Sequence, residues 1–67
     1  MTVLAQTTEY LVEFESRMLS IARFSDGHVI GLVGKRLSGD FKSCVKSHGA
    51  ERAIGTYLRL SAALLSR

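Results

Sequence analysis

Hydrophobic and polar positions alternate over residues 9–24, and the pattern fits two different elements. In steps of two, the even-numbered positions from Tyr10 to Phe24 are uncharged, whereas the charges fall on odd-numbered positions. This is typical of a strand with one solvent-facing side. In steps of 3.6, Tyr10, Phe14 and Met18 belong to one apolar stripe, which is typical of an amphipathic helix. The segment alone leaves both alternatives open.

The residues that follow favour strands. Ser25-Asp26-Gly27 is a strong turn sequence, because Asp accepts hydrogen bonds from nearby backbone and Gly adopts a positive φ at little cost. Residues 28–34 are rich in β-branched side chains and interrupted by glycine, which disfavours a helix. A single strand over 9–24 would be too long. We therefore predict a turn near Ser16-Arg17, although that dipeptide lacks Gly, Pro and Asn.

The register of the second hairpin follows from its expected three-residue loop. Ala22 is then expected to face Ile30, and Ser20 to face Leu32. One face of the hairpin is expected to hold Met18, Phe24, Ile30 and Leu32. The opposite face is expected to hold Leu19, Ile21, Val29 and Val33.

Two helices are predicted for the second half of the chain. Ser38 or Asp40 is expected to cap a short helix, and Gly49 is expected to end it in a left-handed conformation. A second helix is expected from about Glu51 to Ser66, with an apolar stripe of Ile54, Tyr57, Leu58, Ser61, Leu64 and Leu65.

The elements together predict an α+β fold, with a short antiparallel β-meander followed by two C-terminal helices. The alternative is an all-α fold of four short helices with a helix-turn-helix-like core.

The 67 residues are 46% hydrophobic and 22% charged, which suits one small folded domain over 1–67 and argues against disorder. So small a core leaves little room for a large enzyme pocket.

Few residues offer catalytic or metal-binding chemistry. Cys44 is the only cysteine, so no internal disulfide forms and a reducing, cytoplasmic location is expected. Cys44 and His48 lie one helical turn apart and make half a zinc site, but no further ligand pair accompanies them. No stretch is long and apolar enough to predict a membrane span. We expect no enzyme activity, no metal and no cofactor.

Charge is divided unevenly along the chain. Residues 1–27 hold two basic and four acidic residues, whereas residues 28–67 hold seven basic and two acidic ones. The second half therefore carries +5 and favours an acidic partner. The alternative function is accordingly a small DNA-binding regulator that contacts phosphates. Its candidate residues are Lys35, Arg36, Lys42, Lys46, Arg52 and Arg59.

The apolar content of the predicted hairpin exceeds what the helices can cover. Two short helices cover one face of a small sheet, so an apolar patch is expected on the other face unless Val3 and Leu4 fold over it. Such patches mark interfaces with a partner protein or a second copy of the chain. The expected apolar anchors are Leu19, Ile21, Val29 and Val33, with Arg17 and Arg23 at the rim.

The segment Ile21-Ala22-Arg23-Phe24-Ser25-Asp26-Gly27-His28-Val29-Ile30, followed by a helix pair after Asp40-Phe41, resembles the layout of small phage-encoded inhibitors of the anti-CRISPR type. Those proteins are built as a β-meander followed by two helices. The resemblance implies a non-enzymatic protein that blocks a nucleoprotein complex by occupying its surface. The positive charge of this chain argues against mimicry of DNA.

Overall fold

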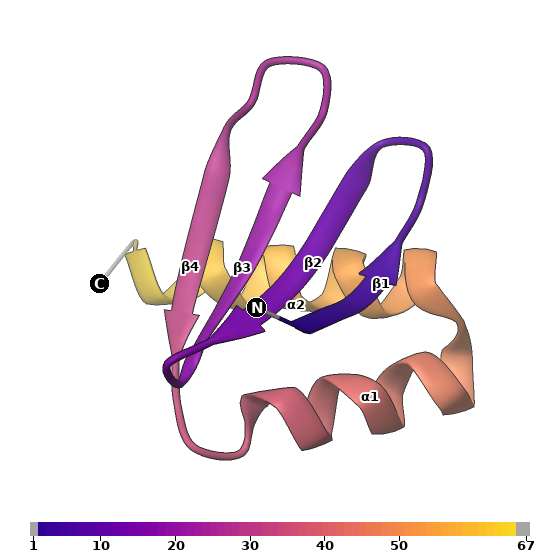
Figure 1. Cartoon of the computed structure of the whole chain (residues 1–67), viewed down its shortest axis with the longest axis vertical. Helices are drawn as coiled ribbons and strands as arrows, with labels where there is room; N and C mark the ends of the chain where they lie inside the picture. Colours follow the sequence, from indigo (N-terminus) through magenta and orange to yellow (C-terminus); the bar gives the residue numbers. More distant parts are fainter. Residues whose placement is uncertain (1, 66–67) are drawn as a thin grey trace.

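The computed structural model describes residues 2–65, with only the backbone described at Leu65. Four strands are followed by two helices (Figure 1). The elements are β1 (Thr2–Gln6), β2 (Tyr10–Glu15), β3 (Met18–Arg23), β4 (Val29–Val33), α1 (Leu37–His48) and α2 (Ala50–Leu65). This confirms the α+β layout and excludes the all-α alternative.

The strands form one antiparallel meander in the order β1-β2-β3-β4. Both helices lie on the same side of this sheet (Figure 1). The N-terminal strand was not predicted. Instead of folding over the sheet, β1 extends it beside β2, with a bulge between Val3 and Ala5.

A two-residue turn at Ser16 and Arg17 joins β2 to β3, as predicted. Both residues have positive φ, 51° and 67°, which is the conformation of a type I′ hairpin turn. That turn twists in the sense of the flanking strands, so it preserves the β2–β3 pairing even without Asn or Gly. The backbone cost of two non-glycine residues in the left-handed region is outweighed by the sheet around them.

The loop between β3 and β4 is longer than predicted and changes the register. It spans residues 24–27 and is closed by hydrogen bonds from the Arg23 N–H to the His28 carbonyl and from the Gly27 N–H to the Arg23 carbonyl, both 2.8 Å. Gly27 supplies the positive φ of 70°. The predicted three-residue loop is therefore wrong, and β4 is shifted by one residue against β3.

The core lies between the sheet and the two helices. Phe41 of α1 is fully buried and meets the ring of Tyr57 of α2 edge to face, with centroids 5.2 Å apart. Burial raises the pKa of the Tyr57 hydroxyl. The remaining buried apolar residues are Val12, Leu19, Ile21, Leu32, Ala53 and Ile54.

The helix boundaries differ slightly from the predicted ones. Arg36 occupies the position before α1, and no side chain caps that end, so the predicted cap by Ser38 or Asp40 is wrong. Gly49 ends α1 as predicted, and its N–H donates to the Val45 carbonyl. Its φ of 90° is positive, but its ψ of 160° lies outside the left-handed helical region. The predicted end of the second helix at Ser66 lies outside the described residues.

The turn at Ser16 and Arg17 offers a direct stability test. We expect the double variant Ser16→Asn, Arg17→Gly to raise the free energy of unfolding by about 1 kcal/mol, because Asn-Gly adopts this turn with less strain. Gly27→Ala is the matched control and should lower the free energy of unfolding. Nothing lies within 4 Å of the added Cβ, so only the strain of a positive φ at alanine remains. Urea unfolding measures both. A double variant no more stable than the parent would contradict the turn assignment.

Candidate functional site

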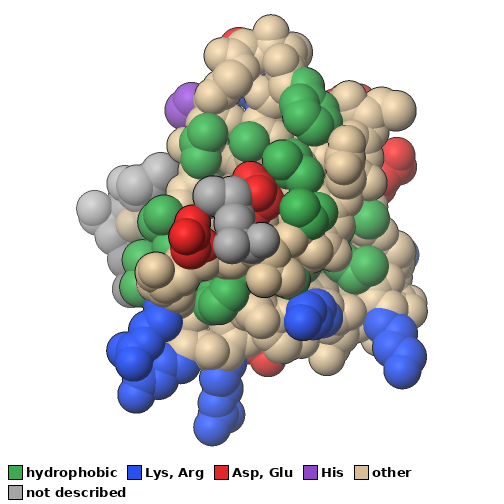
Figure 2. Space-filling model, viewed as in Figure 1, with side chains coloured by type: hydrophobic (Ala, Val, Ile, Leu, Met, Phe, Trp, Pro, Cys, Tyr) green, Lys and Arg blue, Asp and Glu red, His purple; other side chains and the backbone are tan. Residues whose placement is uncertain are grey.

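One face of the sheet is not covered by the helices, and we call it the open face. Directly paired residues of neighbouring antiparallel strands share a face, so the register defines its members. They are Val3, Gln6, Leu11, Glu13, Glu15, Met18, Ser20, Ala22, Val29, Gly31 and Val33. Figure 2 shows this face, with apolar side chains spread over the sheet and acidic ones among them.

The open face has two chemically different halves. On β2, Glu13 and Glu15 follow Leu11 along this face and make an acidic row. The six positions on β3 and β4 carry no charge, and we call them the uncharged half: Met18, Ser20, Ala22, Val29, Gly31 and Val33. Three large apolar side chains of this half are open to solvent, at 44% for Met18, 58% for Val29 and 78% for Val33.

The Met18 side chain lies over Gly31. Its Sδ atom is 3.0 Å from where a Cβ on Gly31 would stand. The missing side chain on β4 therefore leaves room for a long, flexible one from β3, and methionine adapts to irregular apolar contacts.

The predicted set of four apolar anchors is divided between the two faces. Leu19 and Ile21 are buried in the core beneath the helices, so the expectation that they are exposed anchors is wrong. Val29 and Val33 are exposed as expected, but they share the open face with Met18 and Ala22. The reason is the four-residue loop, one residue longer than predicted, because a shift of one residue moves every side chain of a strand to the opposite face.

The expected rim of arginines is also altered. Arg23 pairs with Tyr10, on the helix-facing side of the sheet, so its predicted place at the rim of the open face is wrong. Its guanidinium instead binds Asp26, with Nε 3.0 Å from Oδ1 and a terminal nitrogen 2.6 Å from Oδ2. The His28 N–H also donates to Asp26. Arg17 remains exposed in the β2–β3 turn, at one end of the open face.

Part of the predicted basic set is brought together at that end. The Gly34 N–H donates to the Arg17 carbonyl at 3.0 Å, which places the turn of Arg17 beside Lys35 and Arg36. Lys42 and Lys46 follow on the exposed side of α1. Lys and Arg side chains gather along the edge of the molecule where α1 lies (Figure 2).

The last two predicted basic residues, Arg52 and Arg59, are exposed on α2, the other helix. No described contact joins them to the cations at the α1 edge. The structure therefore divides the predicted phosphate-binding set between the segment from Lys35 through α1 and the helix α2.

Two members of the exposed apolar surface were not predicted as such. Met18 was assigned to the opposite face from Val29, and only the true loop length would have corrected this. Leu64 was assigned to the buried stripe of the last helix, but its side chain is half exposed beside β4. The available signal was length: the apolar stripe of this helix is longer than the five-residue strand β4 can cover, and Leu64 lies near the end of that stripe.

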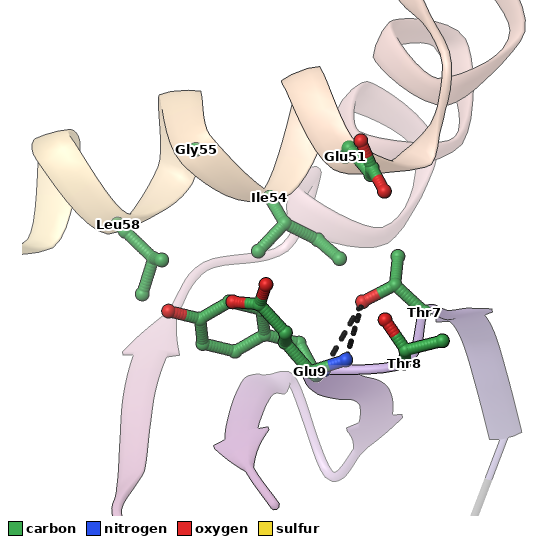
Figure 3. A pocket seen from close by; sticks show the side chains of 8 residues that line it. Thr7, Thr8, Glu9, Glu51, Ile54, Gly55 and Leu58 are labelled. Carbon is green, nitrogen blue, oxygen red and sulfur yellow. Dashed lines mark hydrogen bonds between the residues drawn. The ribbon is translucent and has the colours of Figure 1, made fainter. Parts of the chain in front are cut away.

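A pocket of about 280 Å³ lies between the β1–β2 turn and α2 (Figure 3). The Thr7 hydroxyl accepts the N–H groups of Glu9 and Tyr10 and fixes that turn. Glu9 and Glu51 bring carboxylates, but the lining holds no histidine, cysteine or lysine. Such a lining offers no nucleophile paired with a base.

Within residues 2–65, no three His, Cys, Asp or Glu side chains are close enough together to hold a metal ion. Cys44 is half-buried and His48 exposed on α1. Neither helix, as far as it is described, has the length and apolar character to cross a membrane.

The chain matches no family model, no curated protein and no solved structure with which it was compared.

The Arg23–Asp26 pair makes a pH-dependent prediction. The hydrogen bonds from Arg23, and then the one from the His28 backbone, hold the pKa of the Asp26 carboxyl far below its usual value. Because the pKa of Asp26 is lower in the folded chain than in the unfolded chain, the ion pair stabilises the folded state above a pH of about 4. This stabilisation is lost as the pH falls through the lowered pKa. We expect the carboxyl ¹³C chemical shift of Asp26 to titrate well below the pKa of an ordinary Asp, which is about 3.9.

Arg23→Ala should move that midpoint back up, whereas Arg17→Ala should leave it in place. A midpoint near the ordinary value in the unmodified chain would contradict the ion pair in solution.

Proposed function

We propose that this chain is a non-enzymatic binding protein that regulates or inhibits a macromolecular partner through the open face of its sheet. The observation that carries the proposal is the uncharged half, where Met18, Val29 and Val33 are exposed side by side on two neighbouring strands. Contiguous apolar surface bordered by charge is characteristic of interaction sites.

The sheet suits this role because its exposed side chains are held in place from behind. Ile21 and Leu19 fix β3 against the helices, so the open-face residues of the same strand are presented on a rigid backbone. Rigid presentation lowers the entropy lost on binding.

The charges around the uncharged half favour a partner of a particular chemistry. Glu13 and Glu15 lie on the strand next to it, so a complementary surface has an apolar centre and a basic side. Proteins that bind nucleic acid carry basic surfaces of this type. A nucleoprotein complex is therefore the partner class that we favour, in agreement with the resemblance to phage-encoded inhibitors.

Substitution within the uncharged half tests the proposal. We expect Met18→Asp to abolish capture of a specific partner from the source cell, and to weaken binding of the purified partner at least about tenfold, because a carboxylate would be desolvated in the contact. Ser47→Asp adds the same charge on the exposed side of α1 and should bind as the unmodified chain does. Circular dichroism of both variants controls for folding.

Equal partner binding by Met18→Asp and the unmodified chain would overturn the proposal for this face.

DNA binding is the second candidate function, and it is supported by the proximity of Arg17 to Lys35 and Arg36. Clustered cations of this kind bind phosphates with a strong dependence on salt. In the same set of measurements, an electrophoretic shift of duplex DNA that is lost in Lys35→Ala, Arg36→Ala but retained in Met18→Asp would favour this candidate over the first.

A further inference from the structure

The structure points to a second interaction surface, distinct from the open face: we propose that the β4 edge of the sheet pairs with the β4 edge of a second copy of this chain. The two strands would run antiparallel about a two-fold axis at Gly31 and join two four-stranded sheets into one. This goes beyond the proposed function, because it concerns the backbone edge and a different partner.

The hydrogen-bonding pattern of β4 shows which backbone groups face outward. The Arg23 N–H donates to the His28 carbonyl at one end of the β3–β4 ladder, and the Gly34 N–H donates to the Arg17 carbonyl at the other. In an antiparallel pair, residues bonded to the neighbour alternate with residues that point away. The N–H and C=O groups of Val29, Gly31 and Val33 therefore point to the free edge.

No described strand pairs with that edge, since β4 is the last in the sheet order. Proteins usually protect such edges with charge, proline, a bulge or a covering element. The opposite edge, β1, carries a bulge between Val3 and Ala5. Within β4, Val29–Val33 contains neither charge nor proline.

The sequence of β4 is nearly palindromic about Gly31. It reads Val-Ile-Gly-Leu-Val, so antiparallel pairing about Gly31 places Val29 opposite the second copy's Val33. Ile30 falls opposite the second copy's Leu32, on the helix-facing side. The outward-pointing residues meet one another in this register, which allows about six main-chain hydrogen bonds across the seam.

A groove beside β4 is open to receive the added strand. It has a volume of about 400 Å³ and runs along residues 28–33, with Ser61 and Leu64 of α2 as its other wall. Leu64 is 51% exposed there. A second strand at the usual spacing of about 4.8 Å would cover the apolar wall of this groove.

Charge also favours the antiparallel arrangement. Lys35 and Arg36 follow β4 after Gly34. Antiparallel pairing keeps the two Lys35-Arg36 pairs at opposite ends of the seam. A parallel arrangement would bring the four cations together at one end.

The joined sheet would bring the two uncharged halves together at its centre. Each Met18 would remain over its own Gly31, and the acidic rows of β2 would lie on the outside. A dimer therefore doubles the surface to which the proposed function is assigned without covering it.

The experiment uses the full chain, made by chemical synthesis so that the Gly31 amide can be N-methylated. This change removes one outward-pointing donor, adds no Cβ and leaves the charge unaltered. We expect the unmodified chain to dimerise in analytical ultracentrifugation, and the methylated chain to associate at least about tenfold more weakly, because a donor is lost from both copies.

Two leucines of α2 supply matched side-chain variants. Leu64→Lys places a charge in the groove and should weaken dimerisation, whereas Leu60→Lys, equally on α2 but outside the groove lining, should not. Amide hydrogen exchange gives the specific readout: protection at Val29, Gly31 and Val33 should rise with protein concentration.

Three results would overturn the proposal. They are a chain that stays monomeric at millimolar concentration, a dimer whose three outward amides still exchange rapidly, and a monomer whose three amides are already protected. The proposed function is tested separately, because partner capture that is lost in Met18→Asp would stand even if the chain proves monomeric.

Discussion

The pairing register of β3 with β4 is the constraint on which the rest of the molecule depends. It places Ile21 opposite Ile30 and Leu19 opposite Leu32, so the largest apolar side chains of both strands face the helices together. Each buried side chain of this size contributes about 1.5–3 kcal/mol, and Phe41 packs into the same core. A slip of one residue would expose half of this set, which is why the register is strongly specified.

The same register determines what remains outside. The residues that alternate with the buried ones along β3 and β4 include Ser20, Ala22 and Gly31, and the Met18 side chain lies over Gly31. They form an uncharged surface between the acidic row of β2 and the β4 edge. The β3–β4 hairpin therefore supplies both the buried side chains that stabilise the fold and the exposed side chains of the proposed binding surface. The core side explains why the sheet is rigid, and the open side explains why a partner is proposed.

Local sequence chemistry was sufficient for the order of the elements from β2 onward but not for the faces. The breaks at Ser16-Arg17 and Gly49 follow from alternation and from glycine at a helix end. The face assignment needed the length of the loop around Asp26, which is closed by backbone hydrogen bonds of Arg23, Gly27 and His28 and by the Arg23–Asp26 ion pair, contacts that periodicity does not encode. The N-terminal strand was missed because a short edge strand gains its order from its neighbour rather than from its own pattern.

The central claim is the β3–β4 register, and cross-strand nuclear Overhauser effects between Hα protons test it most directly. In non-hydrogen-bonded antiparallel pairs the Cα atoms approach to about 4.5 Å, so their Hα protons give strong signals. The account predicts such signals between Ala22 and Val29 and between Ser20 and Gly31. Signals between Ala22 and Ile30 and between Ser20 and Leu32 would contradict it, because they would return Leu19 and Ile21 to the same face as Val29 and Val33.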